Sequence, residues 1–371
     1  MTTNAQAAIC YGNEKPFAIE EVTLDDPRAD EVLVRVHACG VCHTDMAVRD
    51  QQLPTPLPAI LGHEGAGVVE KVGAGVTHVK PGDRVLMSFD SCGGCPSCEV
   101  EKPTYCYNFI PYNWIGTRPD GSPTTHQGDA PVNASFFGQS SFATYALGHA
   151  RNVVKIPDSA ADVPLATLAP LGCGLMTGAG AVLRSMAVRK GLPIAIFGTG
   201  AVGLGAVMAA KIAGANPIIA VDIHDNRLDK ARELGATHII NGKSQDAVGA
   251  IKELCPQGLA YAFDTTGINK IIEGAFSLLA PLGIVGIVGA SAPGDTLTFD
   301  ESNFMGGGRR VMGILGGDSD IQTFLPELIE HHLAGRFPHD GLIKTFPFAQ
   351  INEAFHAGES GAVVKPVLVM G

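Results

Sequence analysis

The chain has 371 residues, more than one typical domain, so we expect two domains. Its hydrophobic content of 46% supplies ample core, yet no run reaches the ~20 apolar residues that cross a membrane. The formal charge of -11 argues against nucleic acid or an anionic membrane as a partner. The opening residues, MTTNAQAAICYG, lack the charged and apolar regions of a secretion signal, so we expect a cytoplasmic protein.

Residues 1–171 are predicted to form a β-rich domain. Three β-branched runs between turn signals are its expected strands: Glu31–Val36, Gly65–Val72 and Asp83–Met87. The proline-rich segment Leu53–Pro58 is a predicted loop, because proline is excluded from helix interiors. Residues 107–135 are rich in Pro, Gly, Asn and Thr and are predicted to form a long surface loop, which is uncommon unless it is functional.

Four of the nine cysteines lie close together, in the pattern C-x2-C-x2-C-x7-C: Cys92, Cys95, Cys98 and Cys106. Cysteines in a cytosolic protein indicate metal binding or catalysis rather than disulfides. Four thiolates complete the tetrahedral shell of a structural zinc and leave no position for a substrate. An iron–sulfur cluster also takes four thiolates, but the bacterial cluster signature has different gaps. Free buried cysteines are the remaining alternative, although Gly93, Gly94 and Pro96 interrupt regular structure between them.

A second group of candidate ligands is scattered along the chain. Cys42 lies in GVCHTD, His63 and Glu64 in GHEGAG, and Cys173 in GCGLMTG, each beside glycines near a strand end or turn. Two cysteines and a histidine form a known ligand set of catalytic zinc, which keeps a fourth position open. Taken singly, each of these residues is better explained as a buried structural cysteine or a core histidine with its hydrogen bonds satisfied.

Residues 172–313 are predicted to form a second domain of alternating strands and helices. It opens with Ile194–Asp222, a buried strand, a glycine turn, a helix of small residues and a strand that ends in an acid. The turn, Gly198-Thr199-Gly200-Ala201-Val202-Gly203, is a full G-x-G-x-x-G, and Asp222 follows about 20 residues later, as in dinucleotide-binding folds. The alternative for the turn is an ordinary strand–turn–helix of a parallel sheet that binds no cofactor. The alternative for Asp222 is a turn residue that only ends the strand.

The later strands and helices of this domain follow in regular alternation. The predicted strands are Thr237–Ile240, Leu259–Phe263, Gly283–Val288 and Arg310–Gly313, and the predicted helices are Arg227–Leu234, Asp246–Leu254 and Asn269–Leu279. Six strands with right-handed crossovers make a doubly wound parallel sheet. Residues 314–371, with a helix at Ile321–Ala334 and a strand at Val364–Val369, are predicted to return to the first domain.

Together, the cysteine motifs, GHEGAG and the glycine turn resemble the zinc-dependent medium-chain alcohol dehydrogenases over essentially the whole chain. The runs FFGQSSFATYAL (Phe136–Leu147) and PLGCGLMTGAGA (Pro170–Ala181) are most similar to aryl-alcohol (benzyl-alcohol) dehydrogenases, and terpenoid-alcohol (geraniol-type) enzymes are close behind. The resemblance implies a GroES-like β-rich catalytic domain, a Rossmann domain with a six-stranded sheet, two Zn2+ per subunit, and NAD. It also implies a homodimer or homotetramer.

The resemblance assigns the catalytic zinc to Cys42, His63 and Cys173, with Glu64 as a nearby carboxylate that can replace the zinc-bound water. Asp45 would orient His63, since metal-bound histidines usually need such an acceptor. Thr44 would bind the alcohol oxygen and begin the proton exit. In the liver-type pattern a histidine five residues after the zinc cysteine ends this exit route, but Ala47 stands here. We therefore expect a shorter route, through Thr44 or His43, and a weaker or shifted pH dependence.

The resemblance also implies a set of cofactor contacts. His43 and Lys365 would contact the pyrophosphate, and Asp222 would bind both ribose hydroxyls and repel a 2′-phosphate, which favours NAD over NADP. The remaining expected contacts are the turn residues Gly198, Gly200, Ala201, Val202 and Gly203, together with Thr177, Arg227, Val288 and Ala290.

The expected substrate pocket is aromatic. Matching positions place Phe89, Phe136, Phe137, Leu53 and Pro111 around the substrate, although each of the three phenylalanines could equally be core. The sequence thus predicts reversible oxidation of primary benzyl-type alcohols to aldehydes. The alternatives are oxidation of geraniol or allylic alcohols, glutathione-dependent oxidation of formaldehyde, and a non-catalytic zinc-binding protein. The formaldehyde reaction is disfavoured because Ile110 and Pro111 offer no charge for an anionic substrate.

Overall fold

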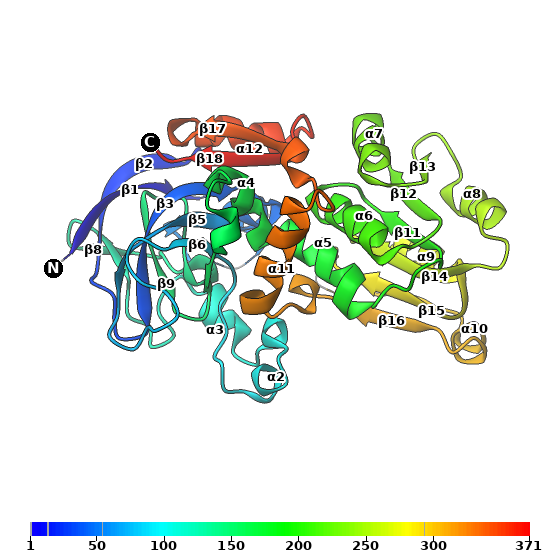
Figure 1. Ribbon diagram of the computed structural model, residues 1–371, viewed down its shortest axis with the longest axis horizontal. Coiled ribbons are helices and arrows are strands. Elements are labelled where there is room, and N and C mark those ends of the chain that lie inside the picture. Colours follow the sequence, from blue (N-terminus) through cyan, green and yellow to red (C-terminus); the bar gives the residue numbers. More distant parts are fainter. Residues whose placement is uncertain (1, 13–14, 54, 293) are drawn as a thin grey trace. The chain divides into compact units, whose positions relative to one another are not determined.

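The structure is a computed structural model that describes residues 2–12, 15–53, 55–292 and 294–371 (Figure 1). The chain divides into two compact units. Unit 1 holds the residues up to Cys173 together with Asp320–Ala334 and His339–Gly371, and unit 2 holds Gly174–Ser319 and Gly335–Pro338. The breaks expected after residues 171 and 313 lie close to those after Cys173 and Ser319.

Unit 1 is built on two sheets. The first has the order β4-β1-β2-β7-β8, and the second β10-β6-β5-β3-β18-β17, with β9 also paired to β3. Their strands are β1 (Thr3–Cys10), β2 (Ala18–Leu24), β3 (Glu31–Gly40), β4 (Ala59–Ile60), β5 (Gly65–Val72), β6 (Arg84–Met87), β7 (Thr125–Gln127), β8 (Ala130–Val132), β9 (Tyr145–His149), β10 (Val153–Lys155), β17 (Ile343–Pro347) and β18 (Lys365–Val369). The three strands predicted for this region are confirmed as β3, β5 and β6.

The helices of unit 1 are short apart from two near the C-terminus. They are α1 (His43–Arg49), α2 (Pro96–Glu99), α3 (Phe109–Asn113), α4 (Leu165–Leu168), α11 (Ile321–Leu333) and α12 (Ile351–Glu359). The strand β18 pairs antiparallel with β3, and Figure 1 shows the red β18 beside the blue β3. The last strand of the chain therefore joins a sheet whose first strand along the chain is β3.

The prediction of one long surface loop over residues 107–135 is wrong. This segment contains α3 and the hairpin β7–β8, and β7 extends the first sheet by pairing with β2. Arg118 is buried there and forms ion pairs with Glu31 (2.6 Å) and Asp25 (2.9 Å). Composition alone therefore did not reveal the strand pairing and the buried ion pairs of this segment. The predicted loop before β4 holds for the described part of Leu53–Pro58, and Pro54 lies outside the described residues.

Unit 2 contains one six-stranded parallel sheet in the order β13-β12-β11-β14-β15-β16, which confirms the predicted doubly wound fold. The strands are β11 (Ile194–Phe197), β12 (Ile218–Asp222), β13 (His238–Asn241), β14 (Leu259–Asp264), β15 (Leu279–Ile287) and β16 (Arg310–Gly313). The central strand β11 is buried throughout, as expected for a strand covered on both faces.

The helices of unit 2 are α5 (Gly174–Gly180), α6 (Ala201–Ala213), α7 (Asp225–Leu234), α8 (Ala247–Leu254), α9 (Asn269–Ser277) and α10 (Glu301–Gly306). The helix predicted at Asn269–Leu279 ends earlier, because Leu279 already pairs with Leu259 as the first residue of β15. In the described part of the chain, no single helix is long and apolar enough to cross a membrane; Leu165–Gly172 and Gly174–Ser185 meet that test only as a bent pair.

Candidate active site and metal centres

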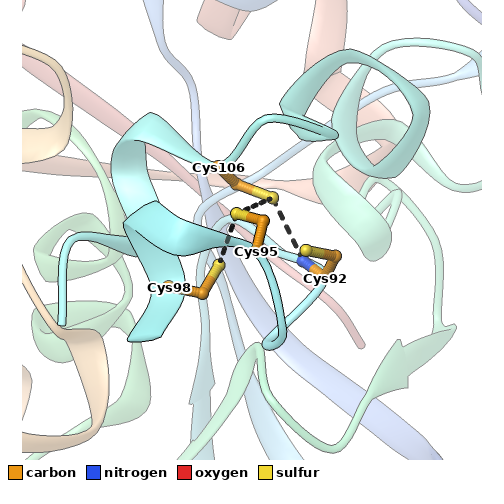
Figure 2. Close-up of side chains that lie close together, drawn as sticks. All are labelled: Cys92, Cys95, Cys98 and Cys106. Carbon is orange, nitrogen blue, oxygen red and sulfur yellow. Dashed lines mark hydrogen bonds between the residues drawn. The ribbon is translucent and has the colours of Figure 1, made fainter. Parts of the chain in front are cut away.

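The four clustered cysteines converge on one point, with their ligand atoms all within 4.8 Å of one another (Figure 2). Cys98 lies on α2, and the other three lie in the turns beside it. The sulfur of Cys95 is 3.5 Å from that of Cys98 and 3.9 Å from that of Cys106. Four sulfurs at these distances fit a tetrahedral metal site.

Main-chain N–H groups support the sulfurs of this cluster. Tyr107 donates to Cys95 Sγ (3.4 Å), while Cys92 and Asn108 donate to Cys106 Sγ (3.3 and 3.4 Å). Burial raises the pKa of Cys92, but the Gly94 main chain and the Asn108 side chain outweigh it and lower the pKa to about 6. Such donors stabilise thiolates, the form that binds metal.

The second predicted group also assembles, within unit 1. The ligand atoms of Cys42, His63, Glu64 and Cys173 lie within 4.8 Å of one another, although the residues span much of the sequence. A hydrogen bond from Cys173, followed by the charge of His63, holds the pKa of Cys42 well below its usual value. This cluster therefore offers two sulfurs and an imidazole to one metal.

Asp45 fixes the imidazole of His63. Its Oδ1 accepts a hydrogen bond from His63 Nδ1 at 2.9 Å, so Nε2 is left to face the cluster. His63 is 1% exposed, and Nε2 has no hydrogen-bond partner among the described residues. A buried nitrogen without a partner is costly unless a further ligand binds it. A zinc ion between Cys42, His63 and Cys173 fits this arrangement.

Glu64 lies beside this cluster in a buried ion pair with Lys365 on β18. The Nζ atom of Lys365 is 2.8 and 2.9 Å from the two carboxylate oxygens and also donates to the Val41 carbonyl. Burial by itself would lower the pKa of Lys365, but the charge and hydrogen bonds of the Glu64 carboxylate raise it above its usual value, so the ammonium stays charged. Lys365 is 2% exposed in this structure, and its Nζ hydrogen bonds are to unit 1 groups.

The helix α1 carries the predicted proton-exit residues. Thr44 Oγ1 lies 3.7 Å from Cys42 Sγ, the exposed His43 begins the helix, and Ala47 is buried. Alanine has no titratable group, so α1 offers no proton acceptor at position 47.

Aromatic rings surround His63. Phe137 stacks on its imidazole at a centroid distance of 4.6 Å, and Phe136 meets it edge-on at 5.4 Å. Phe109 contacts both Phe137 and Phe89 at 6.2 Å, and Trp114 lies 5.4 Å from Phe137. Phe136 is fully buried core, whereas Phe137, Leu53 and Pro111 are half-buried. The predicted pocket residues Phe89, Phe136 and Phe137 are thus linked by ring contacts to a metal ligand.

Gln139 is a site residue that sequence reasoning missed. Its side chain donates to the His63 carbonyl (3.0 Å) and accepts from the Gly65 N–H (3.1 Å), which fixes the main chain on both sides of Glu64. The only signal was its place within the run FFGQSSF, where glutamine looks like a solvated loop residue.

The glycine turn in unit 2 has the three features expected of it. Gly198 has φ +88°, a Cβ on Gly203 would lie 1.9 Å from the Gly198 carbonyl oxygen, and a Cβ on Gly200 would meet nothing within 4 Å. The first and third glycines are thus required by the fold, and open space beside the second lets a pyrophosphate approach the start of α6. Ala201 and Val202 form the first turn of this helix.

Asp222 ends the strand next to the turn and organises it. Its Oδ2 accepts from the main chain (2.6 Å) and hydroxyl (2.7 Å) of Thr199, and its Oδ1 from the N–H groups of Ile223 (2.7 Å) and His224 (3.0 Å). Burial raises its pKa, but these hydrogen bonds outweigh burial and lower it. The acid is therefore ionised at the carboxyl end of β12, where ligands bind in such sheets.

Four other expected cofactor contacts lie in unit 2, whereas His43 and Lys365 lie in unit 1. Val288 follows β15 and is half-buried, Ala290 is exposed, and Thr177 is buried in α5. Arg227 lies on α7, and its Nε atom is buried without a hydrogen-bond partner among the described residues.

Known proteins share this fold and these motifs. The alcohol dehydrogenase GroES-like domain profile matches residues 28–158, and the zinc-binding dehydrogenase profile matches residues 201–330. Geraniol dehydrogenase of Castellaniella defragrans is 43% identical over 368 residues, which cover 99% of this chain and 98% of that protein. A probable alcohol dehydrogenase of a Pseudomonas species is 44% identical over 281 residues, covering 75% of this chain and 88% of that protein.

Two crystal structures superpose over the whole chain. An alcohol dehydrogenase zinc-binding domain protein from Burkholderia ambifaria is 47% identical, with a TM-score of 0.97. Benzyl alcohol dehydrogenase from Acinetobacter calcoaceticus is 41% identical, with a TM-score of 0.95. Each comparison covers 100% of both chains.

Proposed function

Because this chain belongs to the zinc-dependent medium-chain alcohol dehydrogenases, we propose that it oxidises primary aromatic alcohols of benzyl type to aldehydes, reversibly and with NAD. The observation that carries this proposal is the aromatic wall beside the catalytic zinc ligands. Phe137 stacks on His63, and Phe109 and Phe89 continue the row of rings. A planar substrate gains from offset or edge-on ring contacts that an aliphatic alcohol cannot make.

The side chains at this site divide the chemical tasks. Cys42, His63 and Cys173 would hold the zinc ion, which when bound would supply a Lewis acid for the alcohol oxygen, and NAD would supply the hydride acceptor. Asp45 holds His63 in the tautomer that presents Nε2. Thr44 Oγ1 receives the alcohol proton and passes it toward His43 or solvent, since Ala47 offers no acceptor. The aromatic wall excludes water from the reacting carbon.

The acid that ends β12 favours NAD over NADP. Asp222 is ionised, and a 2′-phosphate would bring two negative charges together in a partly buried site. We also propose that a second copy of the chain is the partner, through the edge strand β16, in a dimer or tetramer.

Oxidation of geraniol or another allylic terpenoid alcohol is the second candidate. It is favoured by the relative named geraniol dehydrogenase, whose 43% identity is comparable with the 41% of the benzyl alcohol dehydrogenase structure. Glutathione-dependent formaldehyde oxidation is disfavoured, because Ile110 and Pro111 provide no charge for an anionic substrate.

One experiment tests these proposals together. Purified protein with measured zinc content is assayed with NAD or NADP and with benzyl, cinnamyl, geranyl and short aliphatic alcohols. We expect two zinc ions per chain and the highest kcat/KM with benzyl alcohol and NAD. A higher kcat/KM with geraniol than with benzyl alcohol would favour the oxidation of terpenoid alcohols. One zinc per chain and no NADH from any alcohol would instead indicate a non-catalytic zinc protein.

A further inference from the structure

The aromatic turn, defined here as Phe136–Gly138, has a backbone conformation that its residues disfavour. Phe137 has φ 51° and ψ 34°, in the left-handed region that bulky side chains rarely adopt. Such a conformation persists only where the surroundings hold it. The stacking of the Phe137 ring on His63 therefore depends on groups outside the turn.

Asn152 provides these groups. Its Nδ2 donates to the carbonyls of Phe137 (3.1 Å) and Gly138 (3.0 Å) and lies 3.4 Å from the carbonyl of Ser88. Because all three neighbours are carbonyl oxygens, which only accept hydrogen bonds, the amide nitrogen must face them. Asn152 is fully buried, and a Cβ on Gly138 would lie 2.8 Å from its Nδ2, so the contact requires glycine there.

The same hydrogen-bond network reaches the zinc ligands. The Ser88 carbonyl also accepts from Gln139, whose amide donates to the main chain of His63. The Ser88 hydroxyl donates at 2.5 Å to the carbonyl of Gly172, which precedes Cys173. Asn152 is thus bound to the turn that stacks on one zinc ligand and, through Ser88, to the segments that carry two of them.

We propose that Asn152 is a positioning residue that sets the preference for a ring-bearing alcohol by holding Phe137 against His63. Asn152 acts through the backbone of the aromatic turn, to which its side chain donates, rather than through a hydrogen bond to a metal ligand or a pocket ring. The substrate part of this inference rests on the proposed function, whereas the positioning of the turn does not.

The test compares Asn152→Ala with the control Asn352→Ala. The Asn352 side chain also binds main-chain groups of unit 1, but these are the N–H and carbonyl of Phe17 (2.9 and 3.1 Å), outside the aromatic turn. Kinetics are measured with benzyl alcohol and with 1-propanol, which has no ring. The second readout is the fluorescence of Trp114, the single tryptophan, which lies 5.9 Å from Phe136 and 5.4 Å from Phe137.

We expect Asn152→Ala to raise KM for benzyl alcohol about tenfold, with a smaller change in kcat and little change with 1-propanol. Trp114 emission should shift to longer wavelength and be quenched more by acrylamide, because the rings around it loosen. Asn352→Ala should leave both readouts unchanged. Asn152→Ser, which keeps one donor, should fall between wild type and Asn152→Ala, and it replaces the alanine variant if that variant does not fold.

Equal losses with both alcohols, or an unaltered Trp114 signal in Asn152→Ala and Asn152→Ser, would overturn the proposal. The two proposals fail separately. If wild-type protein does not oxidise benzyl alcohol, the aromatic-substrate proposal is wrong. The Trp114 shift still decides whether Asn152 holds the turn.

Discussion

The single carboxylate of Asp45 accepts hydrogen bonds from three groups. Its Oδ1 binds His63 Nδ1 and the Gly62 N–H, and its Oδ2 accepts from the N–H of Cys42 at 2.9 Å. Two zinc ligands from separate segments are therefore oriented by the same buried side chain, which is itself 0% exposed. Asp45 thus links the segments of Cys42 and His63 and orients the imidazole, as outer partners of metal ligands do.

Replacing a catalytic zinc ligand should separate activity from folding. We expect Cys42→Ser to lower kcat by ~1000-fold, because several kcal/mol of charge stabilisation at the reacting oxygen are lost. NAD binding should persist, since the glycine turn and Asp222 lie in unit 2. Steady-state kinetics and NAD titration are the measurements, and Cys10→Ala, at a buried cysteine outside both clusters, is the control. Loss of the folded state in Cys42→Ser alone would contradict the catalytic assignment.

Asp222 should contribute to stability in a pH-dependent way. Its pKa is lowered in the folded protein relative to the ordinary 3.8, so its contribution is present above pH 3.8 and is lost as pH falls through the lower, folded value. Asp222→Asn should therefore have a smaller unfolding free energy than wild type at neutral pH. The difference should shrink in acid, as followed by urea unfolding at several pH values. A difference that is independent of pH would show that the charge is not responsible.

The same residue should set the cofactor preference. We expect Asp222→Gly to weaken NAD binding by about tenfold or more, the effect of losing hydrogen bonds to a charged acceptor, and to favour NADP relative to wild type. Isothermal titration with both cofactors gives the two dissociation constants. An unchanged ratio between them would mean that the acid does not contact the ribose.

At the scale of the elements, hydrophobic periodicity located the regular structure of unit 2 well, but in unit 1 it missed strands such as β1 and β2. All six strands of the parallel sheet were predictable. Inner strands such as β11 are buried on both faces and stand out as short apolar runs, whereas the less buried edge strands β13 and β16 follow from the alternation of strands and helices. The structure of segment 107–135 was not predictable, because its hairpin is stabilised by pairing with β2 and by the buried ion pairs of Arg118. Such partners are distant in sequence, and local composition does not report them.

The candidate site, too, was predictable only in part. Both cysteine groups were predictable from residue type, spacing and family resemblance, and the structure brings each together. Asn152 and Gln139 act on main-chain carbonyls through the tertiary fold, and no spacing rule identifies such contacts. Likewise, the ion pair of Lys365 with Glu64 joins residues at opposite ends of the chain. It is created only when β18 pairs with β3.

The loop of four cysteines has little other structure to stabilise it. Only the four-residue helix α2 and a short turn lie between Cys92 and Cys106, and Val100 is largely exposed. We expect Cys98→Ser to lower the unfolding free energy by about 4 kcal/mol or more, as losses of a bound metal do. Denaturant unfolding and zinc content measure this effect, and Cys255→Ser is a control outside both clusters. Unchanged stability with one zinc lost would show that this metal is not structural.

At the scale of the whole molecule, each unit carries its own binding groups. Both candidate metal sites lie in unit 1, and the glycine turn with Asp222 lies in unit 2. Metal removal and cofactor binding should therefore be separable in solution.

Chelation provides the test of this separation. Treatment with 1,10-phenanthroline should abolish alcohol oxidation, while NAD at 100 times its dissociation constant should still stabilise the protein by about 2.7 kcal/mol. Thermal unfolding with and without NAD, before and after chelation, gives the comparison. If chelation also removed the stabilisation by NAD, cofactor binding would require the metal sites.

The pairing of β18 with β3 has a consequence for synthesis on the ribosome. Unit 2 is encoded almost entirely by one continuous stretch, Gly174–Ser319, and can fold while the chain is still growing. Unit 1 must wait, because the partner of the Ala38–Gly40 end of β3 is supplied by Lys365–Val369. During that interval, this end of β3 lacks its β18 partner and Glu64 lacks its lysine. A nascent chain halted before residue 365 should therefore depend on chaperones far more than the finished protein does.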